Sequence, residues 1–190
     1  DIVCHAVKTL IHAMTPRDRL AIVAWSTSAN VALGLTQMDE SGRALADTAL
    51  SRLVPDGTTN LWDGLAKSLE ILSQAKPPPG RTGITNSSIF LLTDGIPNIE
   101  PPRGTLPMLK RYKETRGTLP GSCSISTFGF GYQLDSRLLI NLAIEGGGMY
   151  GYIPDAGSVG TTFVNAAANL LSTITKDVEL TVQPQNGATF

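Results

Sequence analysis

The chain has 190 residues, of which 42% are hydrophobic and 16% are charged, and its formal net charge is -1. This length and apolar content are typical of one globular domain with a sizeable core and exclude a disordered chain. The near-neutral charge and the lack of any basic run argue against binding to nucleic acid or to an anionic membrane. No apolar run reaches the ~20 residues that a membrane-spanning helix needs.

The first half of the chain predicts a helix, a strand hairpin and two further helices. Apolar residues recur at helical spacing over 2–14, while 20–25 forms a short apolar run typical of a buried strand. Apolar residues alternate with small or polar ones over 31–35, which predicts a strand that turns back at the sheet edge. Helical spacing returns over 45–53 and again over 61–72.

The middle of the chain predicts two more strands. Residues 89–92 form a continuous apolar run, the pattern of a parallel strand that is covered on both faces. Four prolines between 97 and 107 predict an irregular connection, followed by a short amphipathic helix around 109–112. The next strand is expected at 123–128.

The remaining elements complete an alternating pattern. Asp135 is a candidate N-cap for a helix over 138–143, followed by a strand at 149–153 and a helix at 163–174. Alternating strands and helices predict an α/β domain with a doubly wound, mostly parallel sheet flanked by helices and one antiparallel edge strand. We expect this domain to cover 1–176. The alternating tail at 177–190 is interpreted as a linker or the start of a β-rich module.

Asp94 and Thr59 place a carboxylate and a hydroxyl beside predicted element ends. Asp94 directly follows the strand at 88–93, at the edge where open α/β sheets bind ligands, and Thr59 lies in the turn before the helix at 61–72. Carboxylate and hydroxyl oxygens suit Mg²⁺, Mn²⁺ or Ca²⁺. An equally open interpretation makes Thr59 a helix cap. Asp63 lies in the first helical turn, where it is expected to complement the helix dipole.

Two segments carry a resemblance to a known family. The turn at 56–65 reads DGTTNLWDGL, and the strand at 88–95 reads SIFLLTDG. Together they resemble the von Willebrand factor A domain, in which a hydroxyl from such a turn and an aspartate from such a strand help to hold one divalent cation. The resemblance implies a Rossmann-like fold and a MIDAS-like cation site that contains Thr59 and Asp94.

Further segments indicate a branch of that family. Residues 18–23 and 126–131 resemble intracellular plant and fungal domains that accompany RING, U-box or Hint-related modules, so the expected location is intracellular and cytoplasmic. The family's Asp-x-Ser-x-Ser turn does not occur in the sequence. We therefore expect an N-terminally truncated domain that lacks its first, central strand, with a gap or another segment between the strands at 20–25 and 88–93.

The resemblance implies a non-enzymatic protein-interaction domain, whose cation binds an acidic residue of a partner protein. No small-molecule substrate is expected. The first alternative is a metal-independent scaffold within a larger protein, including one of the ubiquitin pathway, and the second is a metal-dependent hydrolase. The sequence lacks a paired base, a nucleophile elbow and a phosphate loop, which disfavours the hydrolase. Residues 146–151 match a dinucleotide-binding pattern, but they follow a helix and precede a strand, the reverse of that motif.

Overall fold

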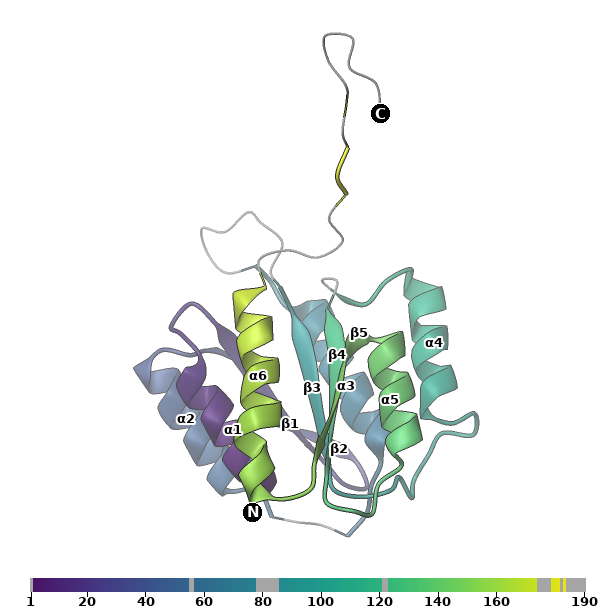
Figure 1. Cartoon of the computed structure of the whole chain (residues 1–190), viewed down its shortest axis with the longest axis horizontal. Coiled ribbons are helices and arrows are strands. Elements are labelled where there is room, and N and C mark those ends of the chain that lie inside the picture. Colours follow the sequence, from purple (N-terminus) through teal and green to yellow (C-terminus); the bar gives the residue numbers. More distant parts are fainter. Residues whose placement is uncertain are drawn as a thin grey trace.

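Helices and strands alternate along most of the chain (Figure 1). The computed structural model describes residues 2–54, 57–77, 86–120, 123–173, 179–181 and 183. The elements are α1 Ile2–Ala13, β1 Arg19–Trp25, β2 Ala29–Gln37, α2 Glu40–Ser51, α3 Leu61–Gln74, β3 Ser88–Thr93, α4 Thr105–Arg116, β4 Ser124–Phe130, α5 Ser136–Glu145, β5 Gly147–Ile153, the 3-10 turn η2 Ala156–Ser158, and α6 Val159–Ser172. Within the described ranges, no helix is both long and apolar enough to cross a bilayer.

The strands form two separate sheets. β1 and β2 pair as an antiparallel hairpin, while β3, β4 and β5 form a parallel sheet with β4 in the centre. The predicted α/β architecture with an antiparallel edge strand is confirmed. β1 and β3 do not pair with each other, and both line one cavity of about 1580 Å³. No ladder joins the two described strands, and the absence of a first, central strand stays a prediction.

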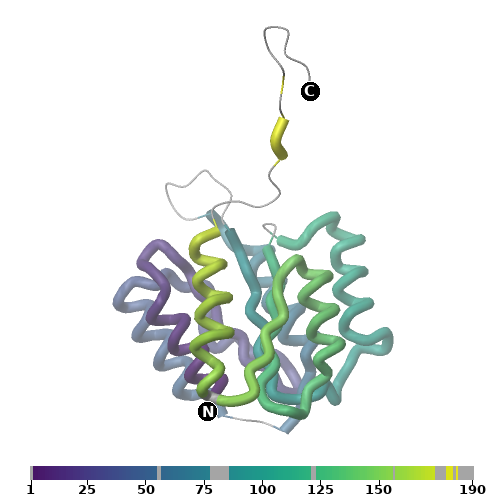
Figure 2. Tube along the Cα trace, in the orientation of Figure 1, coloured from purple at the N-terminus to yellow at the C-terminus, as the bar shows by residue number. Residues whose placement is uncertain are grey.

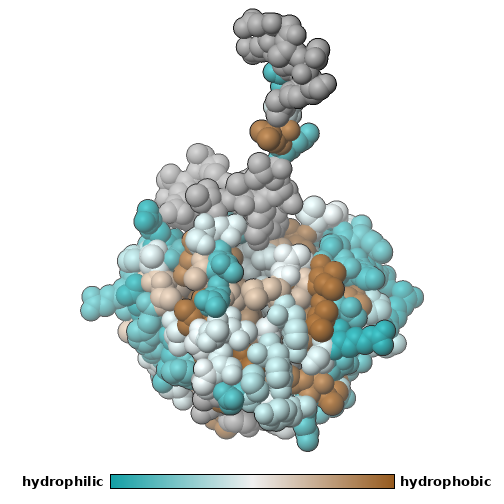
Figure 3. Space-filling view, in the orientation of Figure 1, coloured by the Kyte–Doolittle hydropathy of each residue, from teal (hydrophilic) through white to brown (hydrophobic). Residues whose placement is uncertain are grey.

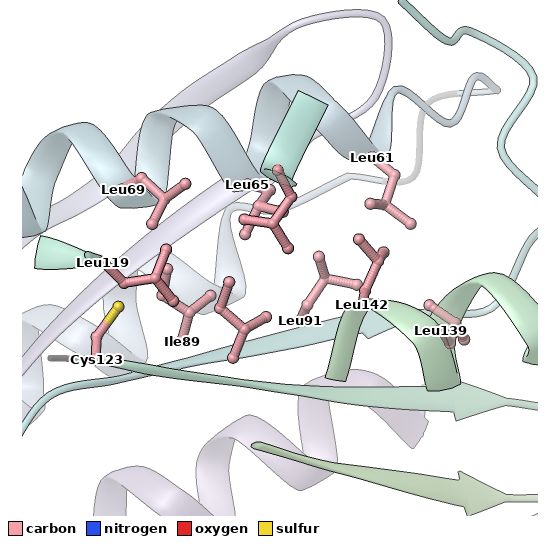
Figure 4. Close-up of a cluster of buried hydrophobic side chains, with 11 residues drawn as sticks. Leu61, Leu65, Leu69, Ile89, Leu91, Leu119, Cys123, Leu139 and Leu142 are labelled. Atoms are coloured by element: carbon pink, nitrogen blue, oxygen red, sulfur yellow. The ribbon is translucent and has the colours of Figure 1, made fainter. Parts of the chain in front are cut away.

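Helices cover both faces of the strands. One layer contains α1, α2 and α6, and Figure 2 shows α1 and α6 side by side. On the opposite face, α3, α4 and α5 enclose a cluster of leucine and isoleucine side chains with Cys123 (Figure 4). Ile89 and Leu91 of β3 belong to this cluster, whereas Phe90 and Leu92 pack toward the α1 and α6 layer. This two-sided burial explains the continuous apolar run in β3.

Three phenylalanines join β3, β4 and α6. The ring centroids of Phe128 and Phe163 lie 5.0 Å apart, and Phe90 lies 5.2 Å from Phe128 and 5.6 Å from Phe163. Tilted and edge-to-face arrangements at these distances are favourable for aromatic rings. Phe128 and Phe163 are both fully buried, so this trio anchors α6 to the parallel sheet.

The face shown in Figure 3 exposes few hydrophobic side chains. A brown, hydrophobic patch on this face lies over α5. Ile140 and Ile144 of α5 are 39% and 72% exposed. Single exposed apolar residues of this kind are common on globular proteins and indicate no binding site by themselves.

The start of α4 and the junction of α5 with β5 bear on two predictions from the sequence. The connection after β3 was expected to stay irregular as far as Pro107, but α4 already begins at Thr105. Proline is tolerated in the first helical turn because its missing N–H has no intrahelical partner there. Gly146 ends α5 and Gly147, with φ of 63°, begins β5, which confirms that 146–151 follows a helix and opens a strand. Most of the tail at 177–190 lies outside the described residues.

We predict that Gly64→Ala destabilises the domain. A Cβ atom at this position in α3 would lie 2.5 Å from Cδ1 of Trp25, so the indole ring must move. Such overpacking costs about 1–3 kcal/mol, which exceeds the gain of about 1 kcal/mol from replacing glycine in a helix. Gly160→Ala in α6 is the matched control, because no atom lies within 4 Å and only the gain remains. Urea unfolding followed by tryptophan fluorescence should give opposite signs, and equal signs would contradict the packing argument.

A second prediction concerns acid stability. The Asp39 carboxylate caps α2 by accepting hydrogen bonds from the Gly42 N–H (2.9 Å) and the Ser41 hydroxyl (2.8 Å), which lower its pKa below the ordinary value of 3.8. The unfolded chain therefore binds this proton more readily, and the stabilisation is lost as pH falls through the folded-state pKa. Asp39→Asn retains a cap and removes the titration. Urea unfolding at about pH 5 and about pH 3 should show a smaller acid loss for the variant; an unchanged loss would exclude this role.

Candidate metal site at the carboxyl edge of the strands

The turn before α3 is tied to the ends of both β1 and β3. The Asn60 N–H donates to the carbonyl of Ser26, which directly follows β1, at 2.8 Å. The Thr59 carbonyl accepts from the N–H groups of Asn98 (3.1 Å) and Ile99 (3.3 Å) in the loop after β3. The Thr59 N–H donates to Oδ1 of Asn98 at 2.8 Å. These bonds place one turn between the carboxyl ends of the two strands.

The Thr59 side chain faces the loop after β3. A Cβ atom added to Gly95 would lie 3.5 Å from the Thr59 hydroxyl oxygen, so this oxygen lies beside the residue that follows Asp94. The interpretation of Thr59 as the helix cap is wrong, because Asn60 caps α3 by accepting from the Asp63 N–H at 3.2 Å. Within the described residues, the Thr59 hydroxyl makes no hydrogen bond. It is therefore available to a ligand.

Asp94 is exposed and directly follows β3. In the part of the chain that the structure describes, its carboxylate forms no hydrogen bond or ion pair. Asp94, Thr59 and Ser26 all line the cavity that β1 and β3 share. The structure thus brings the segments that carry the two predicted ligands to one edge. Binding of a single cation by both side chains stays a prediction.

Asp63 has a different role from these residues. It lies in the first turn of α3, where a carboxylate interacts favourably with the helix dipole. Its Oδ2 accepts a hydrogen bond from the Ala29 N–H at 2.6 Å. Asp63 therefore holds the loop between β1 and β2 against α3, as a structural group at the rim of the site.

The donor set at this edge restricts the cation that it could hold. No group of three His, Cys, Asp or Glu side chains with metal-binding geometry occurs among the described residues. Ca²⁺ needs six to eight oxygen ligands, whereas Mg²⁺ keeps several of its own waters and requires one or two carboxylates. One carboxylate with neighbouring hydroxyls therefore fits a hydrated Mg²⁺ ion better than Ca²⁺.

Asn98 and Asn60 organise this site, and neither was predicted from the sequence to do so. Asn98 fixes Thr59, and Asn60 joins the turn to the loop after β1 through its Nδ2, which donates to the Thr27 carbonyl at 3.0 Å. The only sequence signal for Asn98 was its position, a polar amide directly after Pro97 in a loop that follows a strand end. Only the fold shows which turn this amide reaches.

Residues 1–96 match the family model described as the von Willebrand factor type A domain. The inter-alpha-trypsin inhibitor heavy chain H1 of Mesocricetus auratus is 28% identical over 179 residues, which cover 92% of this chain and 19% of the relative. The human heavy chain H1 is 26% identical and aligns with 75% of this chain. The chain spans less than a fifth of the length of these relatives.

Solved structures show the same fold. A von Willebrand factor type A protein from Catenulispora acidiphila superimposes with a TM-score of 0.75 and 23% identity, covering 90% of this chain and 38% of the other. Proximal thread matrix protein 1 from the mussel byssus, described with a zinc-occupied MIDAS motif, gives a TM-score of 0.62 and 19% identity. It covers 87% of this chain and 39% of the mussel protein.

Proposed function

Since the chain belongs to the von Willebrand factor type A domain family, we propose that it is a protein-interaction domain that binds a partner's carboxylate through a divalent cation. Domains of this family generally mediate protein interactions through a cation at the MIDAS. In this chain the proposed ligands are Thr59 and Asp94, the ion is Mg²⁺ or Mn²⁺, and the partner protein presents an aspartate or glutamate.

The observation that carries the proposal is the meeting of the Thr59 turn with the loop after β3. The Thr59 hydroxyl has no hydrogen-bond partner among the described residues and lies beside Gly95, while the neighbouring Asp94 carboxylate is exposed. Hard oxygen ligands that leave part of the coordination shell to water can exchange a water for a partner's carboxylate. The mussel protein of the same fold, described with a zinc-occupied MIDAS motif, supports binding of a divalent cation.

The test uses an array of immobilised peptides that each carry one central aspartate or glutamate. The full chain should bind a subset in Mg²⁺ or Mn²⁺, lose them in EDTA and bind them again when Mg²⁺ is restored. Matched peptides with asparagine or glutamine should not bind, because a neutral amide is a much weaker ligand for a hard cation. Capture that is unchanged by EDTA would contradict the proposed mechanism.

A metal-independent scaffold is the second candidate function. It is favoured by the lack of a three-residue His, Cys, Asp or Glu cluster within the described ranges and by the missing Asp-x-Ser-x-Ser turn. Calorimetric titration with MnCl2 separates the two candidates, since a scaffold gives no binding heat. Hydrolysis of p-nitrophenyl phosphate in the same buffer would instead favour the metal-dependent hydrolase.

The proposed cellular setting rests on sequence motifs alone. The segments 18–23 and 126–131 support an intracellular protein of the RING, U-box or Hint-associated branch, and the tail at 177–190 supports a following module. The relatives described above are animal heavy chains, so they do not bear on this branch. Microscopy of the tagged protein in its source cells is the direct measurement, and an extracellular location would exclude this setting.

A further inference from the structure

Three large side chains are exposed to solvent at the carboxyl edge of the parallel sheet. Tyr132, in the loop after β4, is 84% exposed, and Ile96, two residues after Asp94, is 56% exposed. Tyr152, near the end of β5, is 38% exposed. Ile96, Tyr132 and Tyr152 are here called the edge patch. Exposed apolar groups that gather beside the polar groups of a binding loop are typical of a protein-interaction surface.

The register of the sheet places the edge patch beside Asp94. Thr93 of β3 is in register with Gly129 of β4, which is in register with Tyr152 of β5. Asp94 directly follows Thr93, so it lies one strand from β4 and two strands from Tyr152. Neighbouring strands lie ~4.8 Å apart, which puts these lateral separations at about 4.8 Å and about 9.6 Å.

The loop after β4 is held against the end of β5. The Gly131 N–H donates a hydrogen bond to the Ile153 carbonyl at 3.0 Å, and Gly131 has a φ of 78°, which turns the chain directly before Tyr132. Partial burial and the nearby Tyr132 raise the pKa of the Tyr152 hydroxyl above its ordinary value of 10.0, as expected for neighbouring phenols. The two tyrosines therefore form one surface.

The spacing of an extended peptide matches this arrangement. Each residue of an extended chain rises ~3.3 Å, so side chains two positions apart lie about 6.6 Å apart on the same face. When one of these side chains lies over Asp94 and the peptide crosses the strand ends, the other lies between the ends of β4 and β5. The partner residue that contacts Tyr132 and Tyr152 is therefore two positions from the residue at Asp94.

The charge of this edge disfavours a second acid in the partner. The segments 94–104, 131–135 and 154–155, which follow the three strands, contain four carboxylates and one cationic side chain, Arg103. Two of the carboxylates, Asp135 and Asp155, cap the elements that follow β4 and β5, on the side of the edge patch. A further carboxylate would be repelled there, whereas an apolar side chain would bury surface without that cost.

We propose that the edge patch selects extended partner segments in which a large apolar residue lies two positions from the aspartate or glutamate, with no second acid at that position. This inference rests on the proposed function, because the acid is taken to bind the cation at Thr59 and Asp94. Tyr132 is the main contact, since tyrosine presents a large ring with few rotatable bonds and is enriched among the residues that dominate binding energy.

The test extends the peptide array and uses the full chain in Mg²⁺. Each peptide has a central aspartate in a glycine and serine background, and one leucine is moved in turn along both flanks. Leucine two positions from the acid, on one flank, should strengthen capture by about tenfold, because roughly half of its side chain becomes buried. Aspartate in place of that leucine should weaken capture relative to serine.

Variants of exposed residues assign this preference to the edge patch. Tyr132→Ser should capture the peptides with and without leucine equally well, whereas Tyr132→Phe should keep the preference because the ring is retained. Ile144→Ser is the matched control. Its side chain is 72% exposed but lies in the last turn of α5, which leads away from the carboxyl edge to the start of β5, so the preference should be unchanged.

The outcomes separate this inference from the function on which it rests. Mg²⁺-dependent capture with no preference for leucine two positions from the acid would overturn the inference and leave the proposed function intact. A preference that Tyr132→Ser retains, or that Ile144→Ser also loses, would overturn it in the same way. Failure of every acidic peptide to bind in a Mg²⁺-dependent manner would overturn the proposed function and this inference together.

Discussion

Asp94→Ala should abolish the Mg²⁺-dependent binding of acidic peptides. Asp94 is the exposed carboxylate at the end of β3, and removing it leaves only neutral hydroxyl ligands near Thr59. A Mg²⁺ ion in a protein is usually held by one or two carboxylates, so loss of this one should weaken cation binding by at least about tenfold, or about 1.4 kcal/mol. Calorimetry with MnCl2 measures the cation, and the peptide array measures capture.

Two further variants control this result. Glu114→Gln removes an exposed carboxylate from α4 and should leave capture unchanged. Asp94→Asn keeps the size of the side chain and should fail like the alanine variant, because the negative charge is required. Circular dichroism and thermal unfolding establish that each variant is folded. Normal capture by a folded Asp94→Asn protein would exclude Asp94 as a ligand.

Phe128→Ala should give the largest loss of stability. The ring is fully buried in the centre of the parallel sheet and contacts both Phe90 and Phe163. Truncating a buried phenylalanine costs about 3–5 kcal/mol, against a total stability of about 5–15 kcal/mol for a typical domain. For a domain of this length, the midpoint of thermal unfolding should fall by roughly 10 °C.

The matched control is Leu45→Ala on α2, whose side chain is 55% exposed. Surface truncations of this kind usually change stability by less than about 0.5 kcal/mol. Guanidinium unfolding of both variants gives the comparison directly. If the two variants lose similar stability, the aromatic trio does not anchor α6 as described.

Most of the fold could be predicted from periodicity. Strands such as β3 are covered on both faces, so their sequences are continuously apolar. Asp135 was predicted as the N-cap of α5 because its residue type and its position before the helix fit that role. Helix ends were harder to place. α4 begins at Thr105 although the proline pattern predicted a loop, because proline in a first turn loses no intrahelical bond.

The site was predictable only in part. Asp94 could be placed at the sheet edge from its position after an apolar strand. The cap of α3 was ambiguous, since Thr59 and Asn60 are adjacent and both residue types are favoured there. The role of Asn98 depends on a hydrogen bond across 39 positions, which no local pattern encodes. Long-range polar contacts of this kind arise from the tertiary structure.

The lack of a ladder between β1 and β3 has a consequence for cooperativity. The hairpin of β1 and β2 packs on α1, α2 and α3, and no backbone pairing links it to the parallel sheet among the described strands. Cooperative units of a protein open separately when few contacts cross their boundary. We therefore expect two classes of amide protons, with exchange faster in β1 and β2 than in β4. Partial opening of the hairpin would expose the cavity that β1 and β3 line while the three-stranded sheet persists. Native-state hydrogen exchange in low denaturant measures this difference.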